Sequence, residues 1–356
     1  MRNGFKVVAN TAVGRRRYLQ FLIPLVLRSE VVDRYDLWVN TLDKIDFEFF
    51  KELAKKYKKI NLIWQPDNFV DGVHTINPFY KYCCEEKTIY VKLDDDIVWI
   101  EPDFFEKMVD FRINNPQYFL VSPLVINNDI STYILQNQNK IHLYDYFVPR
   151  CYNPQWYNGY FATQIHNWFI DNYLKTEKYS ELYCGERIVS INRFSINAVL
   201  WFGFEMAKFD GLVTGDDEEF LSVIMPTNLN KPNCFNCDCL ISHFAFGYQR
   251  KVLDSNGTLD KYKNVLLDLF KKDNLLLDLY DQVYGVIEYV EGRKEEIMLQ
   301  DIPYHGVRNT KIGKLKHGFY KKLRKSITID RIFNLLNEIK EIIYIRRTAK
   351  REYILK

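Results

Sequence analysis

The chain has 356 residues, of which 47% are apolar and 27% charged, and its formal net charge is +3. This balance excludes a disordered chain, and the low counts of Gly (15) and Pro (11) exclude collagen-like or linker-rich architectures. No window approaches the ~18 consecutive apolar residues of a membrane-spanning helix. The N-terminus also lacks the long apolar core of a signal peptide, so we expect a cytoplasmic protein.

The first 125 residues alternate between strand and helix patterns. The expected strands are 5–10, 35–40, 61–64, 88–93 and 118–121, and the expected helices are 18–27, 47–58 and 77–86. The segment 127–195 is irregular and aromatic, 259–280 has a helical pattern, and a domain boundary is expected near 255. Strands that alternate with helices favour a mostly parallel sheet covered on both faces, which binds ligands at the carboxyl ends of its strands.

Three adjacent carboxylates, Asp94, Asp95 and Asp96, directly follow the apolar strand 88–93. Adjacent carboxylates repel one another, and a nearby cation offsets that cost. Mg²⁺ or Mn²⁺ is the natural partner, usually shared with substrate phosphates. An apolar turn, 97–100, follows, whereas a surface acidic run is rarely flanked by core-like residues. The pattern therefore predicts a metal site; the alternative is a solvated acidic turn.

The stretch VKLDDDIVWIEPDFF resembles the D-x-D region of metal-dependent glycosyltransferases of the GT-A fold. The resemblance implies an α/β, GT-A-like, Rossmann-related sandwich with a mostly parallel central sheet and a C-terminal helical extension. Residues 1–255 would form the nucleotide-sugar-binding and catalytic domain, and 256–356 a helical region. It also implies that Asp96 ligates the metal directly, that Asp94 binds the metal through water or the ribose, and that Asp95 lies close to the donor sugar or metal.

Four acidic residues, 216–219, precede a second apolar helical pattern. Carboxylates at a helix N-terminus are stabilised by the helix dipole, so simple capping is one interpretation. In inverting members of the resembled family an acidic motif at this place supplies the general base. The base must lie within hydrogen-bond reach of the acceptor hydroxyl. The resemblance makes Asp217 the first choice for this role and Asp216 the second.

His243 ends an apolar segment, and the resemblance implies that it supplies the last metal ligand; the alternative is a hydrogen-bonded core histidine. It also closes a C-x2-C-x-C-x3-H spacing with Cys234, Cys237 and Cys239, which could make a zinc site. One imidazole nitrogen can hardly serve both sites. Seven cysteines without an export signal are more simply reduced thiols.

Two weaker predictions concern the nucleotide. In the resembled family the loop after the first strand borders the nucleotide, so Arg15 is expected to contact phosphate. The alternative is a solvated basic helix start. Asp67, which follows the third expected strand, is expected to face uracil or ribose.

The basic character of the chain lies in its tail. Residues 311–356 hold 14 Lys and Arg against 4 Asp and Glu, which leaves the rest of the chain acidic. Apolar residues recur at helical spacing there: Ile332, Leu335, Leu336, Ile339, Ile342 and Ile343. A basic amphipathic helix suits an anionic membrane surface, although a helix packed on the main domain or a partner-binding helix has the same pattern. No nucleic-acid-binding module is recognisable.

Together these features predict a glycosyltransferase that uses Mn²⁺ or Mg²⁺ and inverts the sugar configuration. Retention is the alternative, and a retaining enzyme would not need the general base. The donor would be a nucleotide-diphosphate sugar, most often UDP-linked in the resembled family. The acceptor would be a glycan or a lipid-linked glycan of a bacterial surface polysaccharide, reached from the inner face of the membrane. One alternative is a metal-dependent phosphosugar or nucleotidyl transferase that uses the same aspartates. The other is a non-catalytic binding or scaffold protein at the membrane surface.

Overall fold

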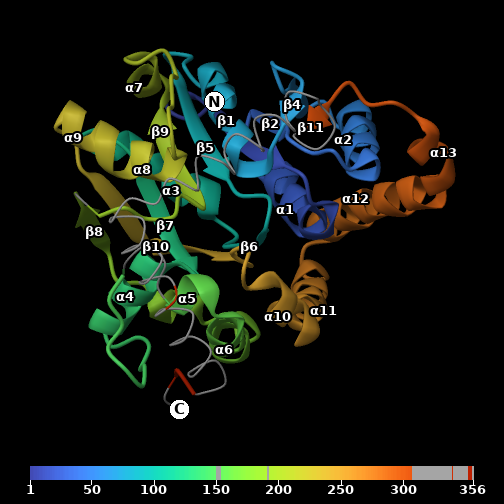
Figure 1. Cartoon of the computed structure of the whole chain (residues 1–356). Helices are drawn as coiled ribbons and strands as arrows, with labels where there is room; N and C mark the ends of the chain where they lie inside the picture. The colour runs from blue at the N-terminus through green and yellow to red at the C-terminus, as the bar shows by residue number, and fades with distance from the viewer. Residues whose placement is uncertain (150–153, 191, 307–338, 340–351, 355–356) are drawn as a thin grey trace.

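The computed structural model describes residues 1–149, 154–190, 192–306, 339 and 352–354. A nine-stranded sheet has the order β3-β2-β1-β5-β9-β7-β10-β6, with β8 also paired to β10 (Figure 1). Its strands are β1 (Lys6–Val13), β2 (Arg34–Val39), β3 (Ile60–Trp64), β5 (Thr88–Leu93), β6 (Ile97–Ile100), β7 (Val121–Ile126), β8 (Glu186–Val189), β9 (Ala198–Phe202) and β10 (Asn233–His243). β4 (Phe69–Val70) and β11 (His305–Gly306) pair with each other in a separate small sheet.

The central sheet is mostly parallel. β1 pairs in parallel with β2 and β5, β2 with β3, and β7 with β10. β9 is antiparallel to both β5 and β7, so those two strands point the same way. Among the described strands of this sheet, only β6, β8 and β9 run against the common direction. This topology confirms the predicted fold class.

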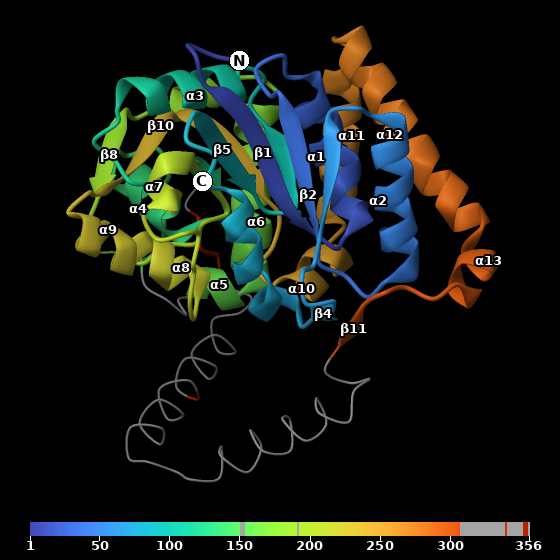
Figure 2. The same cartoon turned by 90° about the horizontal axis from the view of Figure 1, so that it is seen from above.

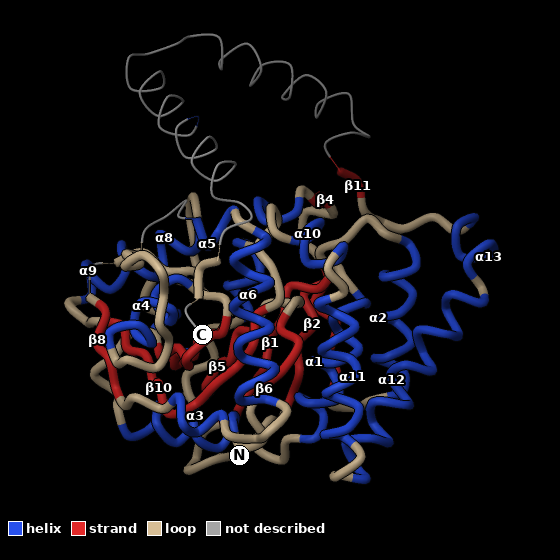
Figure 3. The backbone as a smooth tube through the Cα atoms, turned by 90° about the horizontal axis from the view of Figure 1, so that it is seen from below, coloured by secondary structure: helices blue, strands red, loops and turns tan. Residues whose placement is uncertain are grey.

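Helices cover both faces of this sheet (Figure 3). The helices of the described residues are α1 (Arg16–Arg28), α2 (Lys44–Lys56), α3 (Phe104–Asn114), α4 (Asp129–Asn137), α5 (Pro154–Tyr157), α6 (Gly159–Phe169), α7 (Gly203–Ala207), α8 (Asp217–Glu219), α9 (Met225–Leu229), α10 (Arg250–Ser255), α11 (Thr258–Phe270), α12 (Asn274–Gly292) and α13 (Lys294–Leu299). Short 3-10 or π segments are η1 (Gly72–Thr75), η2 (Asn77–Tyr82), η3 (Ile170–Leu174), η4 (Tyr179–Leu182) and η5 (Phe220–Ile224).

Alternation along the strands divides the core into two hydrophobic layers, one on each face. In β5, Ile89, Val91 and Leu93 join one layer, which includes buried residues of α2 and α3. Tyr90 joins the other layer, which includes buried residues of α4 and α6. Because successive strand side chains point to opposite faces, this pattern requires a sheet covered on both sides.

Three expected elements differ from the structure. The strand predicted at 118–121 is β7, Val121–Ile126. The helix predicted at 77–86 is only the short η2, which buries the adjacent residues Phe79 and Tyr80 and so lacks the apolar stripe of an α-helix. The helical pattern of 259–280 divides into α11 and α12, because Asp273 caps a new helix by accepting hydrogen bonds from the amides of Leu275 and Leu276.

The segment 127–195 is more helical than expected. Asn128 caps α4 by accepting from the amide of Ser131, and Asn158 caps α6 by accepting from the amides of Tyr160 and Phe161. Asparagine is among the preferred N-cap residues. The two caps therefore begin helices within a segment whose composition resembles a loop.

The helices beyond residue 255 form the predicted extension. α12 packs against α1 and α2 (Figure 2), so the extension is joined to the helices that flank the N-terminal strands. A division into domains at 255 stays a prediction. None of the helices among the described residues is long and apolar enough to cross a bilayer. Apart from Ile339 and residues 352–354, the basic tail lies outside the described residues, and its contact with a membrane surface stays a prediction.

Candidate metal and nucleotide site

The carboxyl ends of β1, β2, β5 and β10 meet at a cavity of about 430 Å³. This is the edge at which parallel α/β sheets bind ligands. The described residues that line the cavity combine carboxylates, cations, small residues and aromatic rings: Ala12, Val13, Gly14, Arg15, Asn40, Thr41, Gly72, Val73, Ile76, Lys92, Asp94, Asp95, Asp96, Trp156, Asn197, Glu218, His243, Ala245, Phe246, Gly247 and Arg250.

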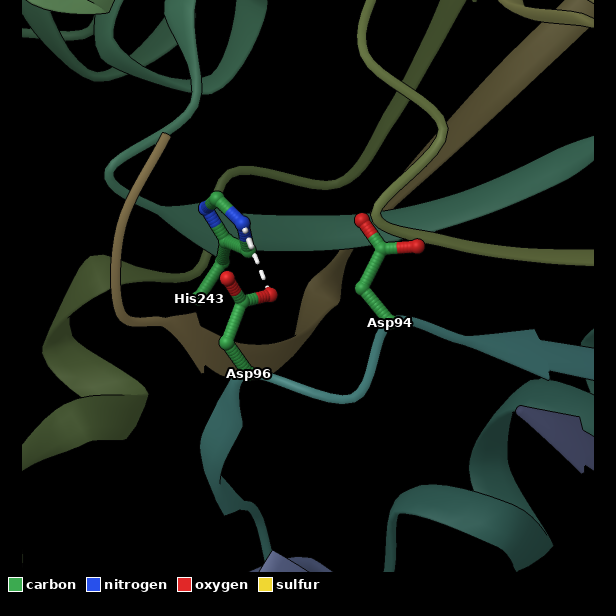
Figure 4. A group of neighbouring side chains, drawn as sticks. All are labelled: Asp94, Asp96 and His243. Atoms are coloured by element: carbon green, nitrogen blue, oxygen red, sulfur yellow. Dashed lines mark ion pairs between the residues drawn. The ribbon is translucent and has the colours of Figure 1, made fainter. Parts of the chain in front are cut away.

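Three side chains converge as a possible metal-binding group, Asp94, Asp96 and His243 (Figure 4). Asp94 and Asp96 lie in the turn between β5 and β6, and His243 is the last residue of β10. One ligand atom from each lies within 4.8 Å of the others, and Nε2 of His243 lies 3.2 Å from Oδ1 of Asp96. The amide of Phe244 donates to the carbonyl of Asp96 at 2.8 Å, which fixes the end of β10 beside the turn.

The group has the donor chemistry of a divalent cation. An ion about 2.1 Å from each ligand atom would need those atoms within about 4.2 Å of one another, so small side-chain rotations would suffice. Carboxylates with one imidazole suit Mn²⁺, and Mg²⁺ accepts the carboxylates. Burial opposes ionisation of Asp96, but Arg15, His243 and Arg250 outweigh it and lower the pKa of Asp96 below its ordinary value. Asp96 is therefore available as an anionic ligand.

Arg15 holds the other carboxylate of the triplet. Its Nε donates to Oδ2 of Asp95 at 3.0 Å and its Nη2 to Oδ1, while the amide of Gly14 donates to Oδ2 at 3.1 Å. Nη1 of Arg15 also donates to Asp96 at 2.9 Å. Asp95 is only 4% exposed. Its hydrogen bonds from Gly14 and Arg15 tie the loop after β1 to the turn after β5. Arg15 borders the cavity where the resemblance expects phosphate, and its contact with phosphate stays a prediction.

Lys92 orients Asp94. Its Nζ donates to Oδ1 of Asp94 at 2.6 Å and to the carbonyl of Ile196 at 2.9 Å, while Asn197 donates to Oδ2 of Asp94 at 3.1 Å. Burial opposes the charge of Lys92, but Asp94 and Asp217 outweigh it and raise the pKa of Lys92. A buried cation thus connects the possible metal group to the second acidic motif.

The members of the acidic motif 216–219 differ in their surroundings. Asp216 is exposed and caps α8 by accepting from the amide of Glu219 at 3.0 Å. Oδ2 of Asp217 accepts from the phenol of Tyr80 at 2.9 Å, and Asp217 is not among the described residues that line the cavity. Glu218 lines the cavity, and burial together with Asp217 raises its pKa to about 7.

The predicted site residues therefore fall into two sets. Asp94, Asp95, Asp96, Arg15 and His243 all line one cavity. Asp216 and Asp217 adjoin it, and Asp67 lies in the exposed turn between β3 and β4, outside the described residues that line it. Their roles stay predictions.

Several lining residues were missed at the level of sequence: Lys92, Trp156, Asn197, Glu218 and Arg250. Lys92 could have been identified from the sequence, because a lysine inside an otherwise apolar strand is rarely buried without a partner for its charge. The others depend on which segments meet in three dimensions.

The cysteines of β10 do not gather around His243. Cys237 joins one hydrophobic layer, whereas Cys234 and Cys239 join the other, on the opposite face of the sheet. Burial raises the pKa of Cys234 to about 12. Among the described residues, the group that could hold a metal uses His243 with Asp94 and Asp96 and includes no cysteine. The structure therefore gives no support to a zinc site here.

A larger cavity of about 520 Å³ lies near the end of α1 and the start of α3. Its lining includes Trp99, Phe105 and several carboxylates, but the possible metal group found among the described residues lies elsewhere. The smaller cavity is therefore the functional candidate on chemical grounds.

No protein-family model and no curated protein matches the sequence. Among solved structures, the chain is similar to CMP:2-keto-3-deoxy-manno-octonic acid synthetase complexed with CTP, with a TM-score of 0.39 and 10% identity over 72% of this chain and 99% of that one. It is also similar to 4-diphosphocytidyl-2C-methyl-D-erythritol synthase from Anaerococcus prevotii DSM 20548, with a TM-score of 0.39 and 10% identity over 72% and 97% of the two chains. At this level of similarity the chemistry of the site must be judged from its own residues.

Proposed function

We propose that this chain is a metal-dependent transferase that acts on a nucleotide phosphate. The observation that carries the proposal is the convergence of Asp94, Asp96 and His243 at the carboxyl edge of the sheet. Three cations, Arg15, Lys92 and Arg250, line the same cavity. A bound divalent ion would offset the charge of a departing phosphate. The cations offer charge-assisted hydrogen bonds to the same phosphates.

The nucleoside would lie on the β1–β2 side of the metal group. Small residues line the cavity there, Ala12 and Gly72, beside the amide of Asn40. Small side chains let a flat ring approach the backbone closely. Oδ1 of Asn40 accepts from the hydroxyl of Thr75 at 2.9 Å, and Nδ2 donates to the carbonyl of Gly72 at 2.8 Å, so this wall is held in place before a ligand arrives.

The finer proposal is transfer of a glycosyl group from a nucleotide-diphosphate sugar to an acceptor hydroxyl. Glu218 is the general base that the geometry favours, because it lines the cavity and its pKa of about 7 matches proton transfer near neutral pH. Asp217 remains the second candidate base, because it is not among the described residues that line the cavity. The carboxylate takes the proton of the acceptor hydroxyl while that oxygen attacks the anomeric carbon and the nucleoside diphosphate leaves.

Nucleotidyl transfer is the second candidate. The observation in its favour is the set of cations, because Arg15, Lys92 and Arg250 together could balance a triphosphate. In either reaction Arg15 would have to exchange part of its contact with Asp95 for the phosphate, because Asp95 engages two nitrogens of the Arg15 guanidinium. The leaving group separates the two candidates: a nucleoside diphosphate in glycosyl transfer, pyrophosphate in nucleotidyl transfer.

The test begins with calorimetric titration of UDP and CTP, each with and without Mn²⁺, into the wild type and Asp96→Asn. We expect metal-dependent binding that Asp96→Asn loses. Asp103→Asn is the matched control, because Asp103 is an exposed aspartate outside this cavity. If neither nucleotide binds the wild type, the proposal fails. If binding occurs, incubation with UDP-sugars, or with a nucleoside triphosphate and sugar acids, identifies the leaving group.

A further inference from the structure

Four aromatic side chains form a cluster at the cavity, here called the aromatic platform: Trp156, Tyr157, Phe246 and Tyr248. The Trp156 ring centroid lies 5.1 Å from Tyr157, 5.9 Å from Phe246 and 5.7 Å from Tyr248, and Tyr157 lies 4.8 Å from Tyr248. Trp156 and Phe246 line the cavity, and Tyr248 is 64% exposed. The other three rings are partly buried. A partly exposed group of large rings beside a polar cavity is a typical ligand-binding surface.

The platform is held rigidly by a buried glutamine. Oε1 of Gln249 accepts from the amide of Phe246 at 2.9 Å and from Nδ2 of Asn127 at 3.0 Å. Its Nε2 donates to the carbonyl of Gln155, the residue before Trp156. These bonds join the loop after β10 to α5. The rings are therefore positioned before a ligand arrives, which lowers the entropy cost of binding.

Open space adjoins the platform on its cavity side. Gly247 lies between Phe246 and Tyr248, lines the cavity, and would bring no atom within 4 Å of an added Cβ. The platform is also continuous with the possible metal group, because the rings of Phe246 and His243 lie 4.8 Å apart. A ligand on the platform would thus sit next to the reacting phosphate.

The sheet order separates the platform from the proposed nucleoside wall. β5, which delivers Asp94 and Asp96, lies between β1–β2 on one side and β7–β10 on the other. The nucleoside wall belongs to β1–β2 and the platform to the end of β10. Two ligands could therefore approach the metal group from opposite directions, as a transfer reaction requires.

We propose that the aromatic platform binds a sugar ring of the acceptor, an inference that rests on the proposed transferase function. Aromatic faces carry negative potential and attract the polarised C–H groups on one face of a pyranose. The phenolic hydroxyl of Tyr248, which is an exposed residue, can meet one of its hydroxyl groups. A sugar matches this mixture of flat apolar faces and polar edges.

The test uses saturation-transfer NMR on the full chain with Mg²⁺ and UDP, and with methyl glycosides of glucose, galactose, mannose, N-acetylglucosamine and rhamnose as probes. We expect at least one glycoside to bind the wild type and to bind about fivefold more weakly to Tyr248→Ser. Gly247→Leu should weaken binding similarly by filling the open space. Tyr289→Ser is the matched control, because Tyr289 is a half-exposed tyrosine on α12.

A separate titration of UDP with Mg²⁺ tests the transferase proposal in the wild type and in Tyr248→Ser. Tyr248 is not among the described residues that line the cavity, so the affinity of Tyr248→Ser for UDP should stay within about twofold of the wild type. The inference is overturned if no glycoside binds the wild type, or if Tyr248→Ser binds glycosides as well as the wild type does. It is also overturned if Tyr248→Ser weakens UDP binding instead, because the rings would then stack on a base. A lipid contact would replace the inference if no glycoside binds the wild type and Tyr248→Ser adsorbs to phosphatidylglycerol vesicles less than the wild type does. Failure of the wild type to bind UDP with Mg²⁺ counts against the transferase proposal, whatever the glycosides do.

Discussion

The Nε2 atom of His243 lies 3.2 Å from Oδ1 of Asp96, which joins the end of β10 to the turn after β5 in one group of ligand atoms. Neither segment forms this group by itself. β6 brings them together, because it follows the turn directly and pairs with β10 in an antiparallel ladder. The register shift at Ser242 and His243 adjusts the direction of the histidine.

Divalent metal should stabilise the protein through His243. At about one hundred times its dissociation constant, Mn²⁺ adds about 2.7 kcal/mol to the free energy of unfolding. We expect His243→Gln to lower the Mn²⁺ affinity at least about tenfold, because a ligand is lost. The check is the melting temperature with Mn²⁺ and with a chelator. An equal metal-dependent rise in the wild type and in His243→Gln would rule out His243 as a ligand.

Replacement of Lys92 by Met should destabilise the fold. The change removes the hydrogen bond to the Ile196 carbonyl and leaves Asp94 without its cation. Losing one partner of a buried pair costs about 2–4 kcal/mol when the remaining groups stay unsatisfied. Urea unfolding measures this cost. Lys55→Met is the matched control, because the exposed pair of Lys55 with Glu52 should contribute nothing measurable. Equal stability of the two variants would contradict the bridging role of Lys92.

Glu218 should couple stability to pH. Its pKa rises from 4.5 to about 7 on folding, so between these values the native state binds more protons than the unfolded state. The contribution of Glu218 to the free energy of unfolding therefore falls as pH rises through that window. Glu218→Gln should match the wild type near pH 4 and exceed its stability by about 1–3 kcal/mol above pH 7. Urea unfolding at several pH values checks this difference.

The same variant tests the catalytic role of Glu218. If this carboxylate is the base, Glu218→Gln gains stability above pH 7 but loses turnover by a factor of about 10²–10⁴. The rate of the wild type should rise as pH passes through about 7. Full turnover in Glu218→Gln together with loss of turnover in Asp217→Asn would assign the base to Asp217 instead.

Tyr353 should hold residues 352–354 on α6. Its ring stacks on Phe161 with centroids 4.5 Å apart, its hydroxyl accepts from Nδ2 of Asn158 at 2.7 Å, and its amide donates to Gln164 at 2.7 Å. We expect Tyr353→Ala to cost about 2–4 kcal/mol, because it removes a buried ring. Hydrogen exchange should speed up in α6. Unchanged exchange there would mean that the contact contributes little to stability.

The sequence determined the fold class and the place of the two aspartates in the possible metal group. Strands and helices follow from local periodicity, and the aspartates had to lie at the ligand-binding edge because they directly follow the buried strand 88–93. The helices of the segment 127–195 were harder to predict, because the asparagines that cap them are also common in loops. Strand alternation alone would place Cys237 and Cys239 on one face, yet they join different hydrophobic layers, because the pairing of β10 with β7 shifts register between Asn236 and Leu240.

Only the tertiary structure decided which acidic side chain reaches the cavity. Asp216, Asp217 and Glu218 are adjacent in sequence, yet one caps a helix, one binds Tyr80 and one lines the cavity. The packing of α8 against segments far away in the chain sets these directions. The same holds for Lys92, whose partner carbonyl belongs to Ile196, and for the meeting of Trp156 with Tyr248. Local sequence specifies the elements through backbone hydrogen bonding and burial, whereas contacts between distant segments depend on how the whole core packs.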